Sequence, residues 1–174
     1  ISLGFAAGHV VGRAVTDDGD TDLRIAFDFD GVLADDSAER VFQSEGLDGY
    51  QESESALAEV PLDRGPMADF LEKINRIQGI EESKRLDDPS GYRRRVHVAV
   101  VTARSAPAHE RAINSIRQWG LSVNDAFFLG GLPKGPMLEV LQPHIFFDDQ
   151  RRHVEGASLS TPSVHIPFGA INRQ

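Results

Sequence analysis

The sequence predicts an α/β fold, a Rossmann-like open parallel sheet sandwiched by helices. Short apolar runs, several of them rich in β-branched and aromatic residues, alternate along the chain with segments of helical periodicity. These runs are apolar throughout rather than alternately polar, as in strands buried on both faces of a parallel sheet. At 174 residues, the chain has room for one such domain with a small insertion.

Five apolar runs are predicted to form the strands of this sheet. The first follows residues 17–22, an acidic stretch of turn-forming residues that we expect to be a solvated loop. The later runs are separated by helical segments, which is the pattern of parallel strands joined by crossovers. The five runs are Leu23–Phe29, Val96–Val101, Ala126–Leu129, His144–Phe147 and Ser163–Ile166.

The clearest helical pattern begins at Gly65. Pro66 suits the first turn of a helix, and apolar residues recur at helical spacing as far as Ile77. The charged residues from Glu81 to Arg95 are expected to form an excursion on the surface. The other predicted helices are two weak pieces, Ser37–Ser44 with a stop at Gly46 and Gln51–Val60 ended by Pro61, followed by Pro107–Trp119 and Pro136–Leu141.

The composition narrows the classes of function. The formal charge of −9 argues against a partner that is a nucleic-acid polymer, which would need a basic face. No apolar stretch approaches the ~20 residues of a membrane span, so no membrane partner is expected. The absence of Cys excludes disulfides and thiolate metal sites and suits a cytoplasmic location. The composition indicates no particular oligomeric state.

The opening of the chain, residues 1–12, is small and apolar. It has neither an initiating Met nor the basic start of a signal peptide. We therefore expect it to belong to the middle of a longer gene product.

Polar residues follow four of the predicted strands at the point where each strand ends. In an open parallel sheet, ligands bind beyond the carboxyl ends of the strands. We therefore expect these side chains to converge at one edge of the sheet. In chain order they are Asp28 and Asp30, Thr102 and Ala103, Lys134, and Asp148 and Asp149.

The acidic residues of this set favour a metal ion. Asp28 and Asp30 stand between apolar residues, where unpaired carboxylates are costly to bury unless a cation compensates them. An all-oxygen cluster favours a hard cation such as Mg²⁺. The alternative for both Asp pairs is a capped turn. A calcium-binding loop is excluded, because Val32 and Leu33 occupy the places where a ligand and a Gly are required.

Three residues of the set can bind an anion such as a phosphate group. Thr102 offers a hydroxyl, and with Ala103 it offers backbone amides at a strand-to-helix turn, although a helix cap is the common role of such a Thr. Lys134 would otherwise be a surface lysine, but a transferred phosphoryl group needs a cation opposite the metal. Arg104 and His165 are expected to be a surface salt-bridge partner and a strand residue rather than ligands.

These signatures, in this order, resemble the motifs of the haloacid dehalogenase superfamily. A closer resemblance is to the cytosolic 5′-nucleotidase type I family, which implies a haloacid dehalogenase-like fold. The segments that carry it are Val-Thr-Ala-Arg-Ser-Ala from Val101, Arg-Gln-Trp-Gly-Leu from Arg117, Ala-Phe-Phe-Leu-Gly-Gly from Ala126, Pro-Lys-Gly-Pro from Pro133 and Pro-His-Ile-Phe-Phe-Asp-Asp-Gln from Pro143.

The resemblance implies Mg²⁺-dependent hydrolysis of nucleoside 5′-monophosphates, AMP notably, and a role for each matching residue. Asp28 would be the nucleophile that forms an aspartyl-phosphate. Asp30 would act as general acid and then as general base. Thr102, Ala103 and Lys134 would bind the phosphate.

The resemblance also implies the ligands of the metal ion. Mg²⁺ would be held by a carboxylate oxygen of Asp28, by the backbone carbonyl of Asp30 and by one of the final acidic pair. Asp149 is the expected ligand, and Asp148 is its neighbour and the alternative. Gly31 stands where that family has Ala, which leaves the base preference open.

Residues 34–60 would form a small helical cap over a catalytic core of residues 1–33 and 61–174. An insertion at this point usually selects the substrate in the superfamily. Phe42 and Tyr50 are candidates to stack on a base, with packing in the cap's own core as the alternative. Two other functions remain open, a phosphatase for another small phosphomonoester and a non-catalytic ligand-binding domain of the same fold.

Overall fold

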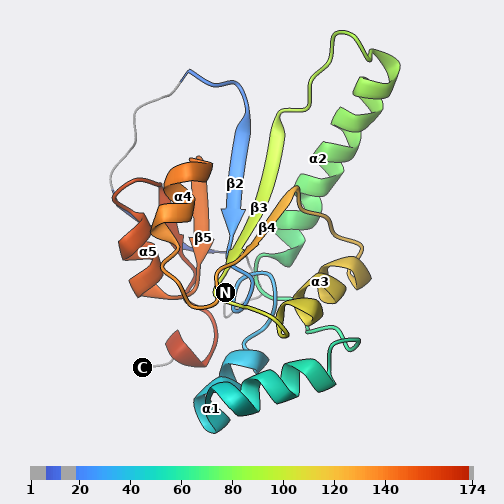
Figure 1. Ribbon diagram of the computed structural model, residues 1–174. Helices are drawn as coiled ribbons and strands as arrows, with labels where there is room; N and C mark the ends of the chain where they lie inside the picture. The colour runs from blue at the N-terminus through green and yellow to red at the C-terminus, as the bar shows by residue number, and fades with distance from the viewer. Residues whose placement is uncertain (1–6, 13–18, 173–174) are drawn as a thin grey trace.

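The computed structural model describes residues 7–12 and 19–172, which contain a six-stranded sheet (Figure 1). Its strand order is β1-β6-β5-β2-β3-β4, and all neighbours are parallel except β1, which pairs antiparallel with β6. This architecture confirms the predicted fold class. The strands are β1 (His9–Val11), β2 (Leu23–Phe27), β3 (Val96–Thr102), β4 (Asp125–Phe128), β5 (Ile145–Asp148) and β6 (Ser163–His165).

Helices cover both faces of the sheet. Figure 1 shows α2 on one side, α4 and α5 on the other, and α1 beyond the carboxyl ends of β2 and β3. Each layer of helices packs on the sheet through its own hydrophobic cluster. The helices are α1 (Ser37–Ala56), α2 (Ala68–Asp87), α3 (His109–Gln118), α4 (Gly135–Leu141) and α5 (Arg151–Ala157), followed by a 3₁₀ turn (Ala170–Asn172).

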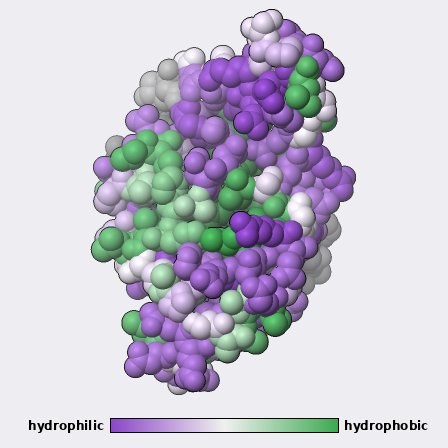
Figure 2. Space-filling view, turned by 45° about the vertical axis from the view of Figure 1, so that its right-hand side comes forward, coloured by the Kyte–Doolittle hydropathy of each residue, from purple (hydrophilic) through white to green (hydrophobic). Residues whose placement is uncertain are grey.

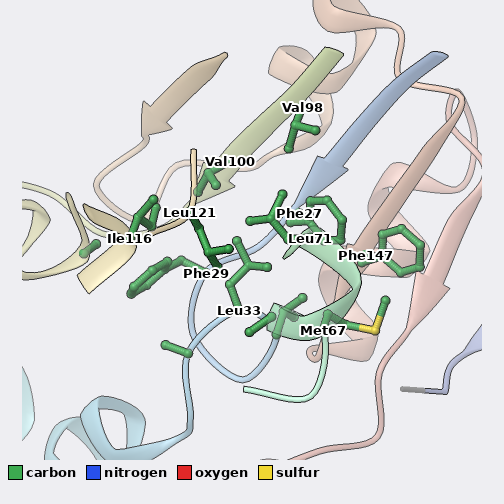
Figure 3. Packing of buried hydrophobic residues seen from close by; sticks show 14 of the residues in the cluster. Phe27, Phe29, Leu33, Met67, Leu71, Val98, Val100, Ile116, Leu121 and Phe147 are labelled. Atoms are coloured by element: carbon green, nitrogen blue, oxygen red, sulfur yellow. The ribbon is translucent and has the colours of Figure 1, made fainter. Parts of the chain in front are cut away.

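The residues of β2 show how one strand contributes to two cores. Ile25 and Phe27 belong to the larger cluster, to which α2 contributes Leu71 (Figure 3). Ala26, between them, belongs to the smaller cluster under α4 and α5. Phe27 also stacks on Phe147 of β5, with ring centroids 5.0 Å apart. Since successive side chains point to opposite faces of a strand, the uninterrupted apolar run at residues 25–27 is what a sheet with two covered faces needs.

The expected surface excursion from Glu81 to Arg95 is confirmed for residues 82–95, none of which is buried, but its first part is helical because α2 continues to Asp87. Glu81 is buried, and its carboxylate accepts hydrogen bonds from the backbone N–H groups of Arg95 and Val96 at 2.9 and 3.2 Å. The hydroxyl of Tyr92 donates a third bond at 3.1 Å. The buried carboxylate of Glu81 therefore connects the later turns of α2 to the start of β3.

Gly46 interrupts α1 without ending it. The helix runs from Ser37 to Ala56, but Gly46 has φ 72° and ψ −166°, outside the helical region, and the helix kinks there. Glycine adopts a positive φ without the penalty of a Cβ. The two predicted helical pieces are therefore two arms of one kinked helix.

The antiparallel edge strand β1 was not predicted from the sequence. It spans His9–Val11, within the apolar opening of the chain. Residues 1–6 of that opening, and residues 17–18 of the expected acidic loop, lie outside the described residues.

One face of the molecule is mostly hydrophilic toward its two ends, with smaller hydrophobic patches there (Figure 2). Figure 2 shows hydrophobic residues in a band across the middle of one face, with hydrophilic residues above and below it. Among the described residues, no helix is long and apolar enough to cross a membrane.

Candidate active site

Asp28 is the first residue after β2 and lines a cavity at the carboxyl edge of the sheet. Its backbone N–H donates to the carbonyl of Phe147 at 2.8 Å, which continues the pairing of β2 with β5. Its Oδ1 accepts a hydrogen bond from the backbone N–H of Phe29 at 2.7 Å. Burial, helped by the carboxylates of Asp148 and Asp30, raises the pKa of Asp28 to about 6.

Lys134 supplies a positive charge beside Asp28. Its Nζ lies 2.8 Å from Oδ2 of Asp28 and 2.6 Å from Oδ2 of Asp148. Lys134 immediately precedes α4 and is buried. Burial alone would lower the pKa of Lys134, but the carboxylates of Asp148 and Asp28 outweigh it and raise that pKa. The amine therefore stays charged, and residues that follow three different strands meet at one point.

Asp149 is a buried carboxylate without such a partner. No residue in the described part of the chain forms a hydrogen bond with its Oδ1. Burial, and then the carboxylates of Asp28 and Asp148, raise the pKa of Asp149 to about 9. Gly31 makes room for this side chain, because a Cβ at that position would overlap the Asp149 carboxylate. Gly31 also has a φ of 70°, which favours glycine.

The donor set around Asp149 fits a divalent cation. An unpaired buried carboxylate beside other carboxylates is costly unless a positive charge compensates it. A hard cation with oxygen ligands supplies that charge. The buried carboxylates of Asp28 and Asp149 are suitable donors for such a cation, whereas both carboxylate oxygens of Asp30 are bound by Arg104.

Asp148 is less available to a metal than Asp149. Its Oδ2 accepts from Lys134, and its Oδ1 accepts from the backbone N–H of Gln150 at 2.7 Å. Nδ1 of His153 lies 3.2 Å from Oδ2. Burial alone would raise the pKa of Asp148, but Lys134 and His153 outweigh it and lower that pKa. Donor atoms of Asp28, Asp148 and His153 do lie within 4.8 Å of one another. The occupied oxygens of Asp148 nevertheless favour Asp149 as the ligand.

Thr102, the last residue of β3, lies in the same cavity. It is buried, and its Oγ1 accepts a hydrogen bond from the backbone N–H of Arg104 at 3.3 Å. The cavity has a volume of about 390 Å³, and Ala103, Asp28 and Asp30 also line it. This volume lies in the usual range for small-molecule sites, about 300–1,000 Å³. The structure therefore brings Thr102, at the end of β3, and Ala103, which follows it, to the acids that follow β2.

Phe42 and Tyr50 of α1 form an apolar wall of this cavity. Their rings meet edge to face, with centroids 6.0 Å apart. Such a contact is typical of core packing. Phe42 is 44% exposed, so part of its ring stays accessible to a ligand.

Arg104 is buried, so the expectation of a surface salt-bridge partner is wrong. Its Nε and Nη2 donate to Oδ2 and Oδ1 of Asp30 at 2.8 and 2.7 Å. Its Nη1 donates to the carboxylate of Glu54. Burial alone would lower the pKa of Arg104, but Asp30, Tyr50 and Glu54 outweigh it and raise that pKa. The guanidinium therefore stays charged.

Sequence reasoning missed two residues beside the site, Glu54 and His153. Glu54 lies in a polar helical stretch, where no local pattern separates one buried Glu from its exposed neighbours. His153 lies on α5, four residues after Asp149, and that proximity to the acidic pair was the available signal. His165 is in β6 as expected, and its Nε2 lies 2.9 Å from the carbonyl oxygen of Asp149.

The fold and the site define a haloacid dehalogenase-like α/β protein. Its mostly parallel sheet gathers carboxylates, a threonine and a buried lysine at one edge, in the chain order that the motifs require. The chain belongs to the 5′-nucleotidase family, whose model matches residues 1–173. This match confirms the resemblance that the sequence motifs indicated.

A curated relative supports the same family. Cytosolic 5′-nucleotidase 1B of Homo sapiens is 40% identical over 141 residues, which cover 79% of this chain and 22% of that protein. The chain therefore spans about a fifth of the length of this relative. The comparison with solved structures gives no match.

Proposed function

We propose that this chain is the catalytic core of a Mg²⁺-dependent phosphatase that hydrolyses nucleoside 5′-monophosphates, such as AMP, to nucleoside and phosphate. The observation that carries the proposal is the contact of Lys134 with Asp28 beside a cavity and close to Asp149, a buried carboxylate with no partner for its Oδ1 in the described residues. The name of the human relative, a cytosolic 5′-nucleotidase, supports this substrate class and a cytoplasmic location.

The proposed reaction has two steps. In the first, a carboxylate oxygen of Asp28 attacks phosphorus, the bond from phosphorus to O5′ breaks, and Asp30 gives its proton to O5′. In the second, the ionised Asp30 takes a proton from a water molecule, whose oxygen attacks phosphorus and displaces the Asp28 carboxylate. Acid–base assistance of this kind is typically worth 10²–10⁴-fold in rate.

Lys134, Thr102 and Ala103 bind the phosphoryl oxygens in this proposal. Nζ of Lys134 lies beside Oδ2 of Asp28, so its charge is next to the attacking group. The hydroxyl of Thr102 and the backbone N–H of Ala103 lie at the end of β3, on the cavity wall. Fixed donors of this kind stabilise charge that develops in the transition state.

In this proposal Asp28 and Asp149 hold the metal ion through their carboxylates and Asp30 through its backbone carbonyl, with Asp148 beside them. When bound, Mg²⁺ neutralises the repulsion between these carboxylates and an anionic substrate. The protein contributes the placement of its own groups. Asp148 keeps Lys134 in position through the contact at 2.6 Å, and Gly31 leaves room for the Asp149 carboxylate.

Residues 34–60 act as a substrate-selecting cap over a core of residues 1–33 and 61–174. Two features support this role. α1 lies beyond the carboxyl ends of the strands (Figure 1), and Phe42 and Tyr50 line the same cavity as the acids. An aromatic wall above a polar floor suits a base attached to a phosphorylated sugar.

A nucleotide panel with and without Mg²⁺ tests the proposed function. Phosphate release is measured from AMP, dAMP, IMP and a hexose phosphate, with the Asp28→Asn variant as the inactive control. We expect Mg²⁺-dependent release that is faster from the nucleotides than from the hexose phosphate, and none from the variant. Equal rates on all four substrates would favour a phosphatase of broader specificity. No turnover by the parent chain would favour a ligand-binding domain.

A further inference from the structure

We propose that Arg104 is a positioning residue for Asp30, and that Glu54 of α1 holds Arg104 in place, so that the α1 segment sets the position of the acid. This role rests on the proposed function, in which Asp30 gives and takes the proton. It assigns a task to two buried residues that the reaction itself does not use.

Arg104 contacts Asp30 through both carboxylate oxygens. Nε and Nη2 donate to Oδ2 and Oδ1 at 2.8 and 2.7 Å. Two parallel bonds from a planar guanidinium fix the plane of a carboxylate as well as its distance. The side chain of Asp30 is 23% exposed at the cavity, so this contact orients a group that a ligand can reach.

The guanidinium of Arg104 is itself held on several sides. Its Cζ lies 5.1 Å from the ring centroid of Phe29 and 5.8 Å from that of Tyr50. Its Nη1 donates to the carbonyl oxygen of Ala108 at 2.9 Å. Arginine stacked on aromatic faces loses little further freedom when it binds a carboxylate. The position of Arg104 is thus set before a substrate enters.

Glu54 connects Arg104 to α1 and α3. It is 1% exposed, and its Oε2 accepts from Nη1 of Arg104. Its Oε1 accepts from Nη1 of Arg111 at 2.7 Å, and Nε of Arg111 donates to the carbonyl oxygen of Val60 at 2.9 Å. The side chains of Asp30, Arg104, Glu54 and Arg111 thus alternate in charge and sum to zero. A buried network of this kind is costly to break at one member, because the other charges stay uncompensated.

This network has a consequence for proton transfer. A carboxylate that binds a guanidinium through both oxygens is an acceptor only, the form that takes a proton from water. A protonated carboxyl keeps one oxygen that only accepts, so in this proposal one bond from Arg104 remains while Asp30 holds the proton. Arg104 therefore holds Asp30 in place during both steps. Glu54, on α1, fixes the position of the Arg104 guanidinium relative to that helix.

Two substrates with different leaving groups distinguish a network that positions Asp30 from one that only stabilises the fold. O5′ of a nucleoside needs a proton as it departs, whereas p-nitrophenolate leaves as a stable anion without one. A network that only stabilises the fold would slow both substrates alike. A network that positions the acid would slow the nucleotide and spare p-nitrophenyl phosphate.

First-turnover rates with enzyme in excess of substrate give the test. One variant, Arg104→Lys, keeps the positive charge but loses the pair of parallel hydrogen bonds to the two oxygens of Asp30. A second, Glu54→Gln combined with Arg111→Met, removes one charge of each sign and so keeps the buried charge balanced. Asp30→Asn provides the pattern expected when the acid is lost. Glu59→Gln is the matched control, since Glu59 lies just beyond α1 and accepts from Asn114 at 3.3 Å.

We expect both network variants to slow nucleoside release from AMP at least about tenfold and p-nitrophenol release less than about threefold, as partial loss of an acid–base contribution predicts. The control should match the parent on both substrates. Equal losses on the two substrates, or no loss, would overturn the role of Arg104 and leave the proposed function intact. A parent chain that releases neither product would overturn the proposed function itself. Because the two variants change different residues, a folding defect in one leaves the other to decide.

Discussion

Nζ of Lys134 lies 2.8 Å from Oδ2 of Asp28, and both residues are buried. The residue proposed as nucleophile therefore has its counter-charge inside the protein before any substrate arrives. In a buried site such a pair interacts more strongly than at the surface, and loss of one partner leaves the other charge uncompensated.

Lys134→Met should reduce kcat/KM for AMP by about 10²–10³-fold, the cost of removing one group that stabilises developing charge. Circular dichroism checks that the variant folds. Lys73→Met is the control, because Lys73 lies on α2 and is exposed. A rate within about twofold of the parent would contradict the proposed phosphate-binding role, since such a group is usually worth several kcal/mol.

Asp149 should make the metal-free protein less stable as the pH rises. Burial and the neighbouring carboxylates raise its pKa from the ordinary value of 3.8, expected for the unfolded chain, to about 9 in the folded protein. Between these values the unfolded chain has released the proton and the folded chain keeps it, so the free energy of unfolding falls with increasing pH. Asp149→Asn carries no such group. In EDTA, the melting temperature of Asp149→Asn minus that of the parent should therefore increase between about pH 5 and about pH 8.

Mg²⁺ provides the complementary measurement on Asp149. Added at about pH 8, it should raise the melting temperature of the parent and leave that of Asp149→Asn nearly unchanged, because binding to the folded state stabilises it. Parallel pH profiles for the two proteins in EDTA, together with equal responses to Mg²⁺, would contradict a metal site at Asp149.

Gly31→Ala should destabilise the protein more than Gly120→Ala. Both glycines have similar backbone angles, φ 70° and φ 69°, so each variant loses about 1–2 kcal/mol by placing a side chain in the left-handed region. A Cβ at Gly120 meets nothing within 4 Å, whereas a Cβ at Gly31 overlaps the Asp149 carboxylate. The overlap should cost about 1–3 kcal/mol more, measured by urea unfolding. Equal losses would show that the Asp149 side chain moves aside at no cost.

Phe42→Ala should raise KM for AMP roughly tenfold with little change in kcat, because stacking on a base is worth about 1–3 kcal/mol. KM for a hexose phosphate should change much less. Leu57→Ala is the control, since Leu57 follows α1 directly, is partly exposed and does not line the cavity. A similar rise in KM for both substrates would indicate that Phe42 only packs the cap.

Much of the sheet and of the site floor could be predicted from the sequence. Residues 25–27 of β2 and 98–101 of β3 are apolar, and strand ends converge at one edge in any parallel sheet, so Asp28 and Thr102 could be placed in one site. Lys134 was expected at the same edge as a phosphate-binding cation, and in the structure it contacts Asp28.

The buried charges could not be predicted in the same way. Arg104 and Glu54 are 50 residues apart, and each is buried because the other is present. Glu81 is buried because backbone N–H groups near the start of β3 need acceptors. Local composition describes such residues as solvated, since the partner that compensates the charge appears only in the folded chain.

The antiparallel pairing of β1 with β6 has a consequence for solubility. Val10 pairs with Val164, and His9 pairs with His165, so the backbone of β6 on this side is already engaged. An uncovered strand there would offer a row of N–H and C=O groups to any other chain with a compatible segment. β1 thus covers one side of β6 and becomes the edge strand itself, and with only three residues it offers little backbone to another chain.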